Sequence, residues 1–182
     1  WDVWNELGYE RYEQYQPSFA AEFGYNGPGS WTMLTNAIGE KIAEFVKDQS
    51  TLQMGIGAIP DAVLGLLKNR KGLRIWTEMF SDGVLELHKA GILDDDMPLN
   101  ASFLFGSREL YDWVNLNRRI RMRRTEVSND PSLIARQAKM TSINSALQVD
   151  LYDQANASFV RGEIYSGFGG STDFIVGALH SR

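Results

Sequence analysis

The fold class is decided by one stretch, Leu52-Gln53-Met54-Gly55-Ile56-Gly57-Ala58-Ile59-Pro60-Asp61-Ala62-Val63-Leu64. Its start continues an apolar run from Thr51, which predicts a short buried strand over residues 51–56. Residues 55–59 form a glycine-containing turn. Pro60-Asp61 then predicts a helix start, because proline suits a first turn and aspartate favours the positive end of the helix dipole. A strand followed at once by a helix is the repeating unit of α/β proteins.

The same alternation continues along the chain. Apolar runs predict further strands over residues 73–79 and 101–105, and a helix with apolar positions at 84–90 lies between them. Ser107 is suited to cap the next helix, and residues 129–131 (Asn-Asp-Pro) start another short one. From Ser142 on, the chain is rich in β-type residues and glycine turns. We therefore expect an α/β fold with an open, mostly parallel sheet and helices on both faces, whose ligands gather at the carboxyl ends of the strands.

The first thirty residues differ in composition from the rest. They carry tyrosine and phenylalanine among Glu and Gln, and they end in the breaker sequence Asn-Gly-Pro-Gly-Ser at 26–30. We expect residues 1–30 to be an N-terminal aromatic-rich extension or linker, and residues 31–182 to be one α/β domain. The chain begins with Trp1 and ends at Arg182 without tapering into polar residues, so we expect it to be a truncated piece of a longer protein.

Composition excludes several classes of function. Hydrophobic residues make up 43% of the 182 residues, which is enough for a packed core. The formal net charge of −5 argues against nucleic acid as a partner, and no apolar run reaches the length of a membrane helix. The chain has no cysteine, which excludes thiol catalysis, and its two histidines have no metal-ligand spacing. We expect a cytoplasmic protein without a metal site and without membrane association.

Two places carry residues suited to chemistry. The turn at 55–59 joins a strand to a helix start, where backbone N–H groups can meet an oxyanion, although a tight turn that only glycine fits explains it equally. Glu78 follows an apolar run, and a partly desolvated carboxylate there can act as a nucleophile. The alternative for Glu78 is an ordinary exposed acid at a strand end.

Two further segments have a weaker signal. Residues 117–124 hold five arginines, which suit either a phosphate or RNA ligand or a half-buried strand whose Ile120 and Met122 alternate with a charged outer face. Residues 166–174 form a second glycine loop, of a kind that can surround a ligand.

Several ordered blocks together resemble the C-terminal domain of the acetyl-CoA hydrolase/transferase family, which includes acetate and 4-hydroxybutyrate CoA-transferases. The resemblance runs from about residue 36 to the end of the chain. It rests on these blocks: residues 52–64, Thr77-Glu78-Met79-Phe80-Ser81-Asp82-Gly83-Val84, Phe105-Gly106-Ser107 with Leu110-Tyr111-Asp112, residues 142–151, and Ser166-Gly167-Phe168-Gly169-Gly170 with Asp173-Phe174.

The resemblance implies a mechanism and a set of site residues. Glu78 aligns with the family's catalytic glutamate, which attacks an acyl-CoA and becomes a glutamyl-CoA thioester before a second carboxylic acid takes the CoA. Coenzyme A is then a substrate, and no tightly bound cofactor is expected. The residues that the resemblance assigns to the oxyanion and CoA are Gly55, Ile56, Gly57, Ala58, Ile59, Asn144, Gly169 and Gly170.

The sequence departs from the family's pattern at three places, namely Gln49-Ser50, Trp76 and Ser171. Acyl-CoA hydrolysis by the same glutamate is an alternative activity. A second alternative is a catalytically incomplete CoA-binding fragment that needs an N-terminal domain or a partner subunit. We expect acyl-CoA and small carboxylic acids as partners and a homo-oligomer as the assembly. Because the family's first domain is missing, we expect little turnover from the chain alone.

Overall fold

The structure is a computed structural model that describes residues 30–55, 58–152, 154–160, 162–167 and 169–182. The chain divides into two units between Ile38 and Gly39. The expected extension, residues 1–30, lies almost wholly outside the described residues, so the expected boundary after residue 30 stays a prediction. Every candidate site residue lies in the larger unit, Gly39–Arg182.

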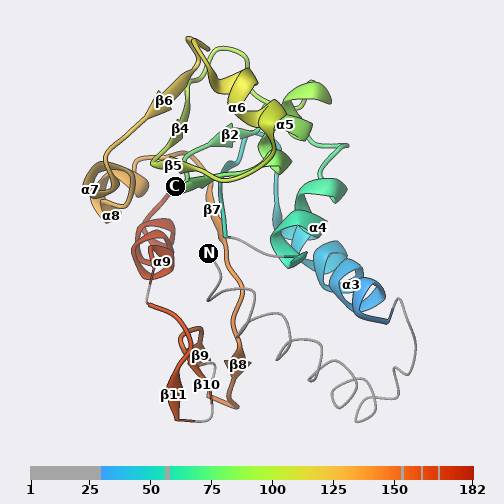
Figure 1. Ribbon diagram of the computed structural model, residues 1–182, viewed down its shortest axis with the longest axis vertical. Helices are drawn as coiled ribbons and strands as arrows, with labels where there is room; N and C mark the ends of the chain where they lie inside the picture. The colour runs from blue at the N-terminus through green and yellow to red at the C-terminus, as the bar shows by residue number, and fades with distance from the viewer. Residues whose placement is uncertain (1–29, 56–57, 153, 161, 168) are drawn as a thin grey trace. The chain divides into compact units, whose positions relative to one another are not determined.

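Strands and helices alternate through this unit, as the sequence predicts (Figure 1). The helices are α3 (Ser30–Phe45), which crosses the unit boundary, α4 (Ala58–Leu66), α5 (Asp82–Lys89), α6 (Arg108–Val114), α7 (Thr125–Ser128), α8 (Pro131–Ile134) and α9 (Ser171–Leu179). The strands are β1 (Thr51–Met54), β2 (Arg74–Ile75), β3 (Met79–Phe80), β4 (Leu99–Ala101), β5 (Phe103–Leu104), β6 (Ile120–Met122), β7 (Met140–Ile143), β8 (Gln148–Val149), β9 (Ala155–Asn156), β10 (Phe159–Val160) and β11 (Glu163–Ile164).

Parallel pairing joins five strands into one row. β1 pairs in parallel with β2 on one side and with β7 on the other, and β4 pairs in parallel with β6. A parallel bridge between Trp76 and Asn100 connects these two groups just beyond β2. The row therefore runs β7-β1-β2-β4-β6, while β3 and β5 form a separate parallel pair.

The order of this row contains a reversal between β1 and β7. From β1 the chain adds β2, β4 and β6 on one side, then returns to place β7 on the other side of β1. In open α/β sheets, ligands bind in the crevice at the carboxyl ends of the strands where the order reverses. Here that place is the end of β1, followed by Gly55, and the end of β7, followed by Asn144.

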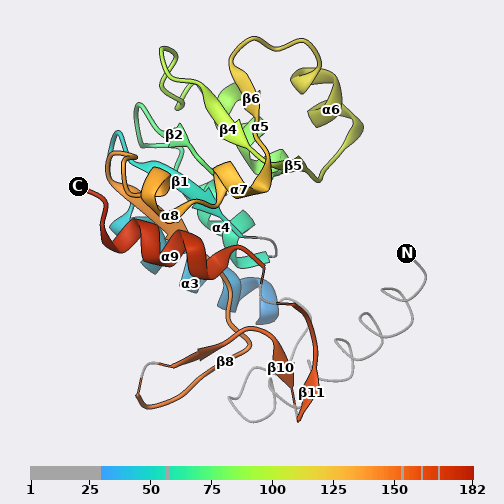
Figure 2. The ribbon, with the colours of Figure 1, turned by 90° about the vertical axis from the view of Figure 1, so that its left-hand side faces the viewer.

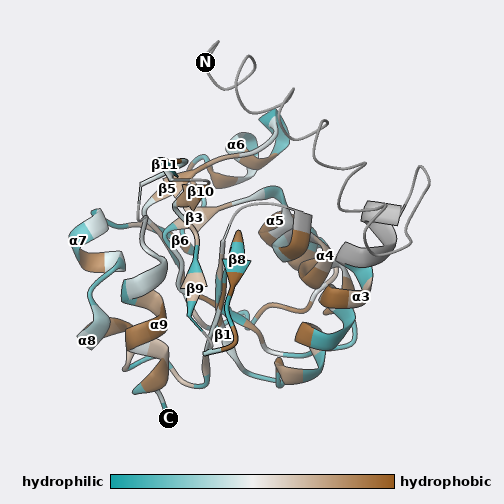
Figure 3. Ribbon diagram, turned by 90° about the horizontal axis from the view of Figure 1, so that it is seen from below, coloured by the Kyte–Doolittle hydropathy of each residue, from teal (hydrophilic) through white to brown (hydrophobic). Residues whose placement is uncertain are grey.

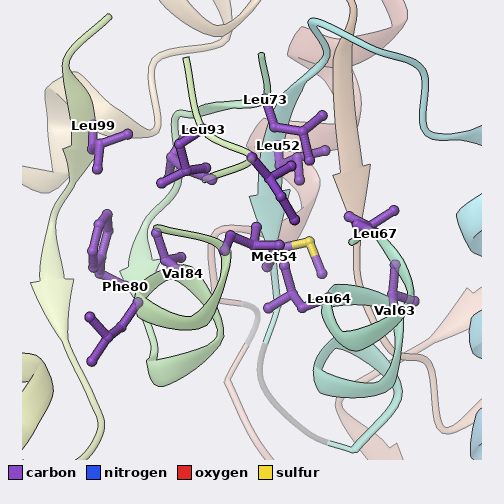
Figure 4. Packing of buried hydrophobic residues seen from close by; sticks show 14 of the residues in the cluster. Leu52, Met54, Val63, Leu64, Leu67, Leu73, Phe80, Val84, Leu93 and Leu99 are labelled. Carbon is purple, nitrogen blue, oxygen red and sulfur yellow. The ribbon is translucent and has the colours of Figure 1, made fainter. Parts of the chain in front are cut away.

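Helices cover both faces of the strands. Figures 2 and 3 show α7, α8 and α9 on one side and α4 and α5 on the other. The larger apolar cluster packs β1 against α4 and α5, with Leu52, Met54, Val63, Leu64 and Val84 among its members (Figure 4). On the opposite face, a smaller cluster joins α8, β7 and α9 through Ile134, Met140 and Phe174. The expected fold class, an open and mostly parallel α/β sheet, is confirmed.

Three local expectations need correction. The strand expected over residues 73–79 is two short strands, β2 and β3, because the chain leaves the β1 edge after the Trp76 bridge and pairs again with β5. The run over 101–105 likewise divides into β4 and β5, which pair with different neighbours. The glycine loop near the end of the chain leads into helix α9, which the β-rich pattern did not predict.

Candidate active site around Glu78

Glu78 lies in the short connection between β2 and β3, where its backbone is fixed on both sides. Its carbonyl oxygen accepts hydrogen bonds from the amides of Ser102 at 2.8 Å and Phe103 at 3.0 Å. The preceding residue, Thr77, is buried. Its amide donates to the Asn100 carbonyl at 3.0 Å, and its hydroxyl donates to the Met79 carbonyl at 3.0 Å. The Glu78 side chain is half-buried, so one part of it stays open to solvent.

One carboxylate oxygen of Glu78 is held by Asn129. The Nδ2 of Asn129 donates to Oε1 of Glu78 at 3.1 Å, and the Oδ1 of Asn129 accepts from the Ser128 hydroxyl at 2.7 Å. Ser128 is fully buried, and its carbonyl accepts the indole N–H of Trp76 at 2.8 Å. The amide that holds Glu78 is therefore oriented by a chain of hydrogen bonds that returns to the segment carrying Glu78.

The other carboxylate oxygen faces Gly170. A Cβ atom at Gly170 would lie 2.5 Å from Oε2 of Glu78 and would also overlap the Asn129 side chain. Gly170 is buried and is the N-cap residue of α9, so the Glu78 carboxylate lies beside the start of that helix. Gly169 has φ +58° and is exposed, a left-handed conformation that favours glycine.

A second group of polar side chains lies where β1 and β7 pair at their carboxyl ends, and we call Gln53, Ser142 and Asn144 the polar cluster. The Gln53 and Asn144 side chains exchange two hydrogen bonds of 3.0 Å each, and the Ser142 hydroxyl donates to Gln53 Oε1 at 2.5 Å. A Cβ at Gly55 would lie 3.1 Å from the Asn144 Oδ1. The structure therefore brings together two of the residues that the resemblance assigns to CoA, Gly55 and Asn144.

The two groups lie on neighbouring strand ends. The Thr77 hydroxyl oxygen is 3.5 Å from the Met54 carbonyl oxygen, so the residue before Glu78 adjoins the residue before Gly55. Among the residues that the structure describes, no hydrogen bond joins Glu78 directly to Gly55 or Asn144. Any ligand that spans both groups therefore runs along the carboxyl edge of the sheet.

The turn at 55–59 is only partly described. The Gly55 amide donates to the Ile143 carbonyl at 2.8 Å, so it is not free for an oxyanion. Ile56 and Gly57 lie outside the described residues. Ala58 and Ile59 begin α4, and amides in the first turn of a helix have no acceptor within the helix. Among the described residues of the turn, the backbone donors that remain for a ligand are the amides of Ala58 and Ile59.

Asp82, the nearest acidic neighbour of Glu78 in sequence, has a structural role. Its carboxylate accepts the Ser107 amide at 2.9 Å and the Ser107 hydroxyl at 2.7 Å. Ser107 in turn caps α6 by accepting the Leu110 amide, which confirms the expected helix cap. A cavity of about 410 Å³ opens beside Asp82, between α4, α5 and Phe105, but Glu78 does not line it.

The position of Asn129 is fixed by the start of α8. Asp130 caps this short helix, and hydrogen bonds from Ser132 lower the pKa of the Asp130 carboxyl below its ordinary value. Asn129 itself was noted from sequence only as part of a helix start. The signal that identifies it is spatial, because residue 129 meets residue 78 only after β6 and α7 have folded back across the sheet.

The arginine segment has mostly structural contacts. Arg119 contacts Asp95 at 3.0 Å and the Asp94 carbonyl at 2.6 Å, and Arg123 donates to Asn100 at 3.1 Å. Arg124 pairs with Glu126. The expected alternation with two inward apolar residues is half wrong: Ile120 is buried, but Met122 is 46% exposed because β6 lies at the end of the row.

No metal or membrane feature accompanies the site in the described residues. That part of the chain has no group of three His, Cys, Asp or Glu side chains placed to hold a metal ion. Among the same residues, no helix combines the length and the apolar character that crossing a membrane requires. What the site offers is a carboxylate with one oxygen held by an amide and the other beside a helix start, on the strand end next to the polar cluster. This arrangement suits a carboxylate nucleophile whose orientation is fixed.

Comparisons with known proteins assign such a carboxylate-bearing α/β domain to an enzyme family. Residues 106–182 match the acetyl-CoA hydrolase/transferase C-terminal domain. Over 152 residues, 80% of this chain, the sequence is 45% identical to a 4-hydroxybutyrate coenzyme A transferase of Clostridium kluyveri. It is also 36% identical over 140 residues to an acetyl-CoA hydrolase of Neurospora crassa. By sequence, the chain belongs to the acetyl-CoA hydrolase/transferase family.

Solved structures give the same assignment. The fold matches RipA from Yersinia pestis with a TM-score of 0.76 and 35% identity over 81% of this chain. It matches a 4-hydroxybutyrate CoA-transferase from Porphyromonas gingivalis with a TM-score of 0.72 and 40% identity. The chain spans only about a third of its relatives' length, 35% of the C. kluyveri protein and 26% of the N. crassa protein.

Proposed function

We propose that this chain is the glutamate-bearing domain of an enzyme that transfers CoA from an acyl-CoA to a carboxylic acid. A Glu78 oxygen attacks the thioester carbonyl carbon, and the C–S bond breaks to give a mixed anhydride and CoA thiolate. The thiolate attacks the side-chain carboxyl carbon of Glu78 in this anhydride. A glutamyl-CoA thioester forms, and the acyl group leaves as a carboxylate. An incoming carboxylate then takes the CoA by the reverse steps.

The observation that carries the proposal is the geometry of the Glu78 carboxylate. Asn129 holds one oxygen at 3.1 Å, and Gly170 leaves just enough room for the other. A nucleophile held in one orientation reacts faster because less motion must be frozen at the transition state. The half-exposed edge of Glu78 gives the thioester a side from which to approach.

For coenzyme A, we propose the polar cluster as the contact surface. Asn144 Nδ2 already donates to Gln53 Oε1 and to the Ser142 hydroxyl, so Asn144 meets the amide-rich arm of CoA through Oδ1, which accepts from Gln53 and can accept a second hydrogen bond. The first-turn amides of α4, at Ala58 and Ile59, supply donors for the oxyanion that forms on the thioester. We assign Gly169 and Gly170, at the start of α9, to the same ligand.

Acyl-CoA hydrolysis is a second candidate, and relatives carrying that name favour it. The same Glu78 adducts serve both reactions. Only the final acceptor differs: water attacks the glutamyl thioester or the anhydride instead of a carboxylate. Access of water to Glu78 therefore decides between the two activities.

The complete reaction is proposed for an assembly larger than this chain. About two thirds of the relatives' length has no counterpart here. We infer that an N-terminal domain or partner subunit supplies the opposite wall of the site, which positions the acyl-CoA and excludes water. We also infer that the assembly is a homo-oligomer and that the chain alone has little turnover.

Trapping the covalent adduct tests the proposal. The purified chain is incubated with acetyl-CoA, with and without the part of the C. kluyveri relative that it does not match, then treated with borohydride. Borohydride reduces a glutamyl thioester to an alcohol, which leaves a stable mass change that peptide mass spectrometry locates. Glu78→Gln is the test variant, and Glu86→Gln, at an exposed position on α5, is the matched control.

A mass change on Glu78 that Glu78→Gln abolishes and Glu86→Gln keeps supports the proposal. A change on another residue contradicts it. Unmodified Glu78 in the reconstituted sample also contradicts it, provided that this sample turns over acetyl-CoA. Adding propionate or butyrate before borohydride then separates the two activities, because transfer gives propionyl-CoA or butyryl-CoA and hydrolysis gives free CoA.

A further inference from the structure

The segment between β7 and α9 forms two hairpins with exposed apolar side chains. β8 pairs with β9 and β10 with β11, both antiparallel, and we call these four strands with their connections (residues 147–165) the hairpin pair. Seven of its large apolar residues are more than a third exposed; they are Leu147, Val149, Leu151, Tyr152, Phe159, Ile164 and Tyr165. Leu151 is 100% exposed and Tyr152 is 85% exposed.

These side chains follow the pattern of a buried sheet face. Leu147, Val149 and Leu151 follow one another at a spacing of two, with Leu147 just before β8, Val149 in it and Leu151 just beyond it. Phe159 and Ile164 are direct cross-strand partners in the other hairpin and share a face. Two-stranded hairpins are marginally stable in water by themselves, so such faces normally pack on something else.

Hydrogen bonds within the hairpin pair hold its two hairpins together, so its exposed apolar side chains form one ordered surface. The Asn156 side chain donates to Gln148 Oε1 at 2.8 Å across the first hairpin and to the Phe159 carbonyl at 2.6 Å in the second. Its Oδ1 accepts the amides of Ser158 at 3.1 Å and Phe159 at 2.9 Å. In Figures 1 and 2 the two hairpins lie beyond the carboxyl end of β7, away from the helices that cover the sheet.

Both ends of the hairpin pair adjoin the candidate site. The hairpin pair begins just after Asn144, which bonds Gln53 in the polar cluster. It ends just before Gly170, which faces Glu78. A molecule bound on the hairpin pair would therefore stand beside both parts of the site.

We propose that the hairpin pair is the docking surface for the part of the longer relatives that this chain does not span. The chain covers 35% of the C. kluyveri relative, so about two thirds of such a protein must pack somewhere on this domain. The hairpin pair offers an apolar face, lies beside the site and has no cover from the sheet or its helices. The inference rests on the proposed function in one respect, namely that the missing part completes the site around Glu78.

The test measures docking without using catalysis. The chain is co-expressed with the part of the C. kluyveri relative that it does not match, and circular dichroism verifies that both are folded. Tyrosines are nitrated in the chain alone and in the complex, and peptides are quantified by mass spectrometry. Tyr152 and Tyr165 report on the hairpin pair, and exposed Tyr111 on α6 is the internal control.

We expect a one-to-one complex in which nitration of Tyr152 and Tyr165 falls at least tenfold while Tyr111 is unchanged. Leu151→Glu should weaken the complex at least tenfold, and Leu116→Glu, at a 92% exposed site after α6, should not. Full reactivity of both tyrosines in the complex would overturn the inference, as would the absence of a complex between folded components. Protection of these tyrosines by self-association of the chain alone would assign the surface to a second copy instead.

The Glu78→Gln variant separates this inference from the proposed function. It should dock like the unchanged chain, since Glu78 is not part of the hairpin pair and glutamine has nearly the same shape as glutamate. Docking without any Glu78 adduct would remove the proposed chemistry and leave the docking surface. A Glu78 adduct in a complex that leaves Tyr152 and Tyr165 reactive would support the proposed chemistry and contradict the docking surface.

Discussion

Oε2 of Glu78 lies 2.5 Å from the point where a Cβ of Gly170 would stand. The carboxylate and the start of α9 therefore occupy one shared space, which only a residue without a side chain leaves open. This contact couples the β2–β3 connection, on which Glu78 lies, to the last helix of the chain. It also explains why the second glycine loop matters although it lies far from Glu78 in sequence.

Gly170→Ala should displace the Glu78 carboxylate and the Asn129 amide together. We expect labelling of Glu78 by acetyl-CoA and borohydride to slow by about 100-fold, since a shift of about 1 Å costs that much in reacting groups. The overlap should also lower the free energy of unfolding by about 1–2 kcal/mol. The measurements are the rate of adduct formation and urea unfolding.

Gly167→Ala is the matched control for Gly170→Ala. A Cβ at Gly167 would meet no atom within 4 Å, and its backbone is not in the left-handed region. We expect unchanged labelling and unchanged stability. Equal effects of the two variants would mean that loop stiffness, and not the contact with Glu78, limits the reaction.

Asn129→Leu should separate the hydrogen bond from the packing. The variant keeps the approximate volume but removes the donor to Glu78 Oε1 and one of two acceptors of the Ser128 hydroxyl, which still reaches the Thr125 carbonyl at 3.2 Å. Because two hydrogen bonds of a buried side chain are lost, we expect a loss of about 1 kcal/mol in the free energy of unfolding. Adduct formation should slow by about 10-fold or more as Glu78 loses its fixed orientation. Asn115→Leu, at an exposed site after α6, should change neither quantity.

The sheet with helices on both faces could be predicted from the sequence because the signals for it are local. The run ending at Met54, the turn at Gly55 and the helix signal at Pro60 follow one another closely, so neighbouring residues determine them, although α4 begins two residues earlier, at Ala58. The division of residues 73–79 into two strands could not be predicted from the sequence. It depends on which neighbouring strand pairs with each half, and pairing partners lie 20 or more residues away.

In the candidate site, too, contacts between residues distant in sequence could not be predicted. Glu78 was identified through its resemblance to a family glutamate, and the structure gives that residue its surroundings. Asn129 was missed because a helix start and a carboxylate partner look alike in sequence. Only the return of the chain through β6 and α7 brings the Asn129 amide to Glu78.

Acid stability should depend on the ion pair between Arg74 and Asp94. The Arg74 Nε donates to Asp94 at 2.9 Å, and this hydrogen bond lowers the pKa of the Asp94 carboxyl below its ordinary value. A lowered pKa in the folded state adds stability that is present above the unfolded pKa of about 3.9 and is lost as pH falls through the folded value. The free energy of unfolding should therefore decrease below about pH 4.

Asp94→Asn should remove that part of the acid slope and cost about 1 kcal/mol at pH 7, a modest value because both side chains are partly exposed. Urea unfolding from pH 2.5 to 7 measures both effects. Asp95→Asn serves as the control, since Asp95 is 90% exposed and its contact with Arg119 is a surface pair. An unchanged acid slope in Asp94→Asn would show that other carboxyls dominate acid unfolding.

Gln53→Leu should be the most destabilising change in the polar cluster. Gln53 is only 4% exposed, and its carboxamide bonds both Asn144 and Ser142. Leucine would remove the partners of the Ser142 hydroxyl hydrogen and of Asn144 Oδ1, although Asn144 would still donate to the Ser142 oxygen, so we expect a loss of about 2 kcal/mol in the free energy of unfolding. Asn144→Leu should cost less, about 1 kcal/mol, because Asn144 is less buried than Gln53 and water can replace part of its hydrogen bonding. Urea unfolding of both variants decides the order, and a larger loss in Asn144→Leu would show that Asn144 contributes more to the polar cluster than Gln53.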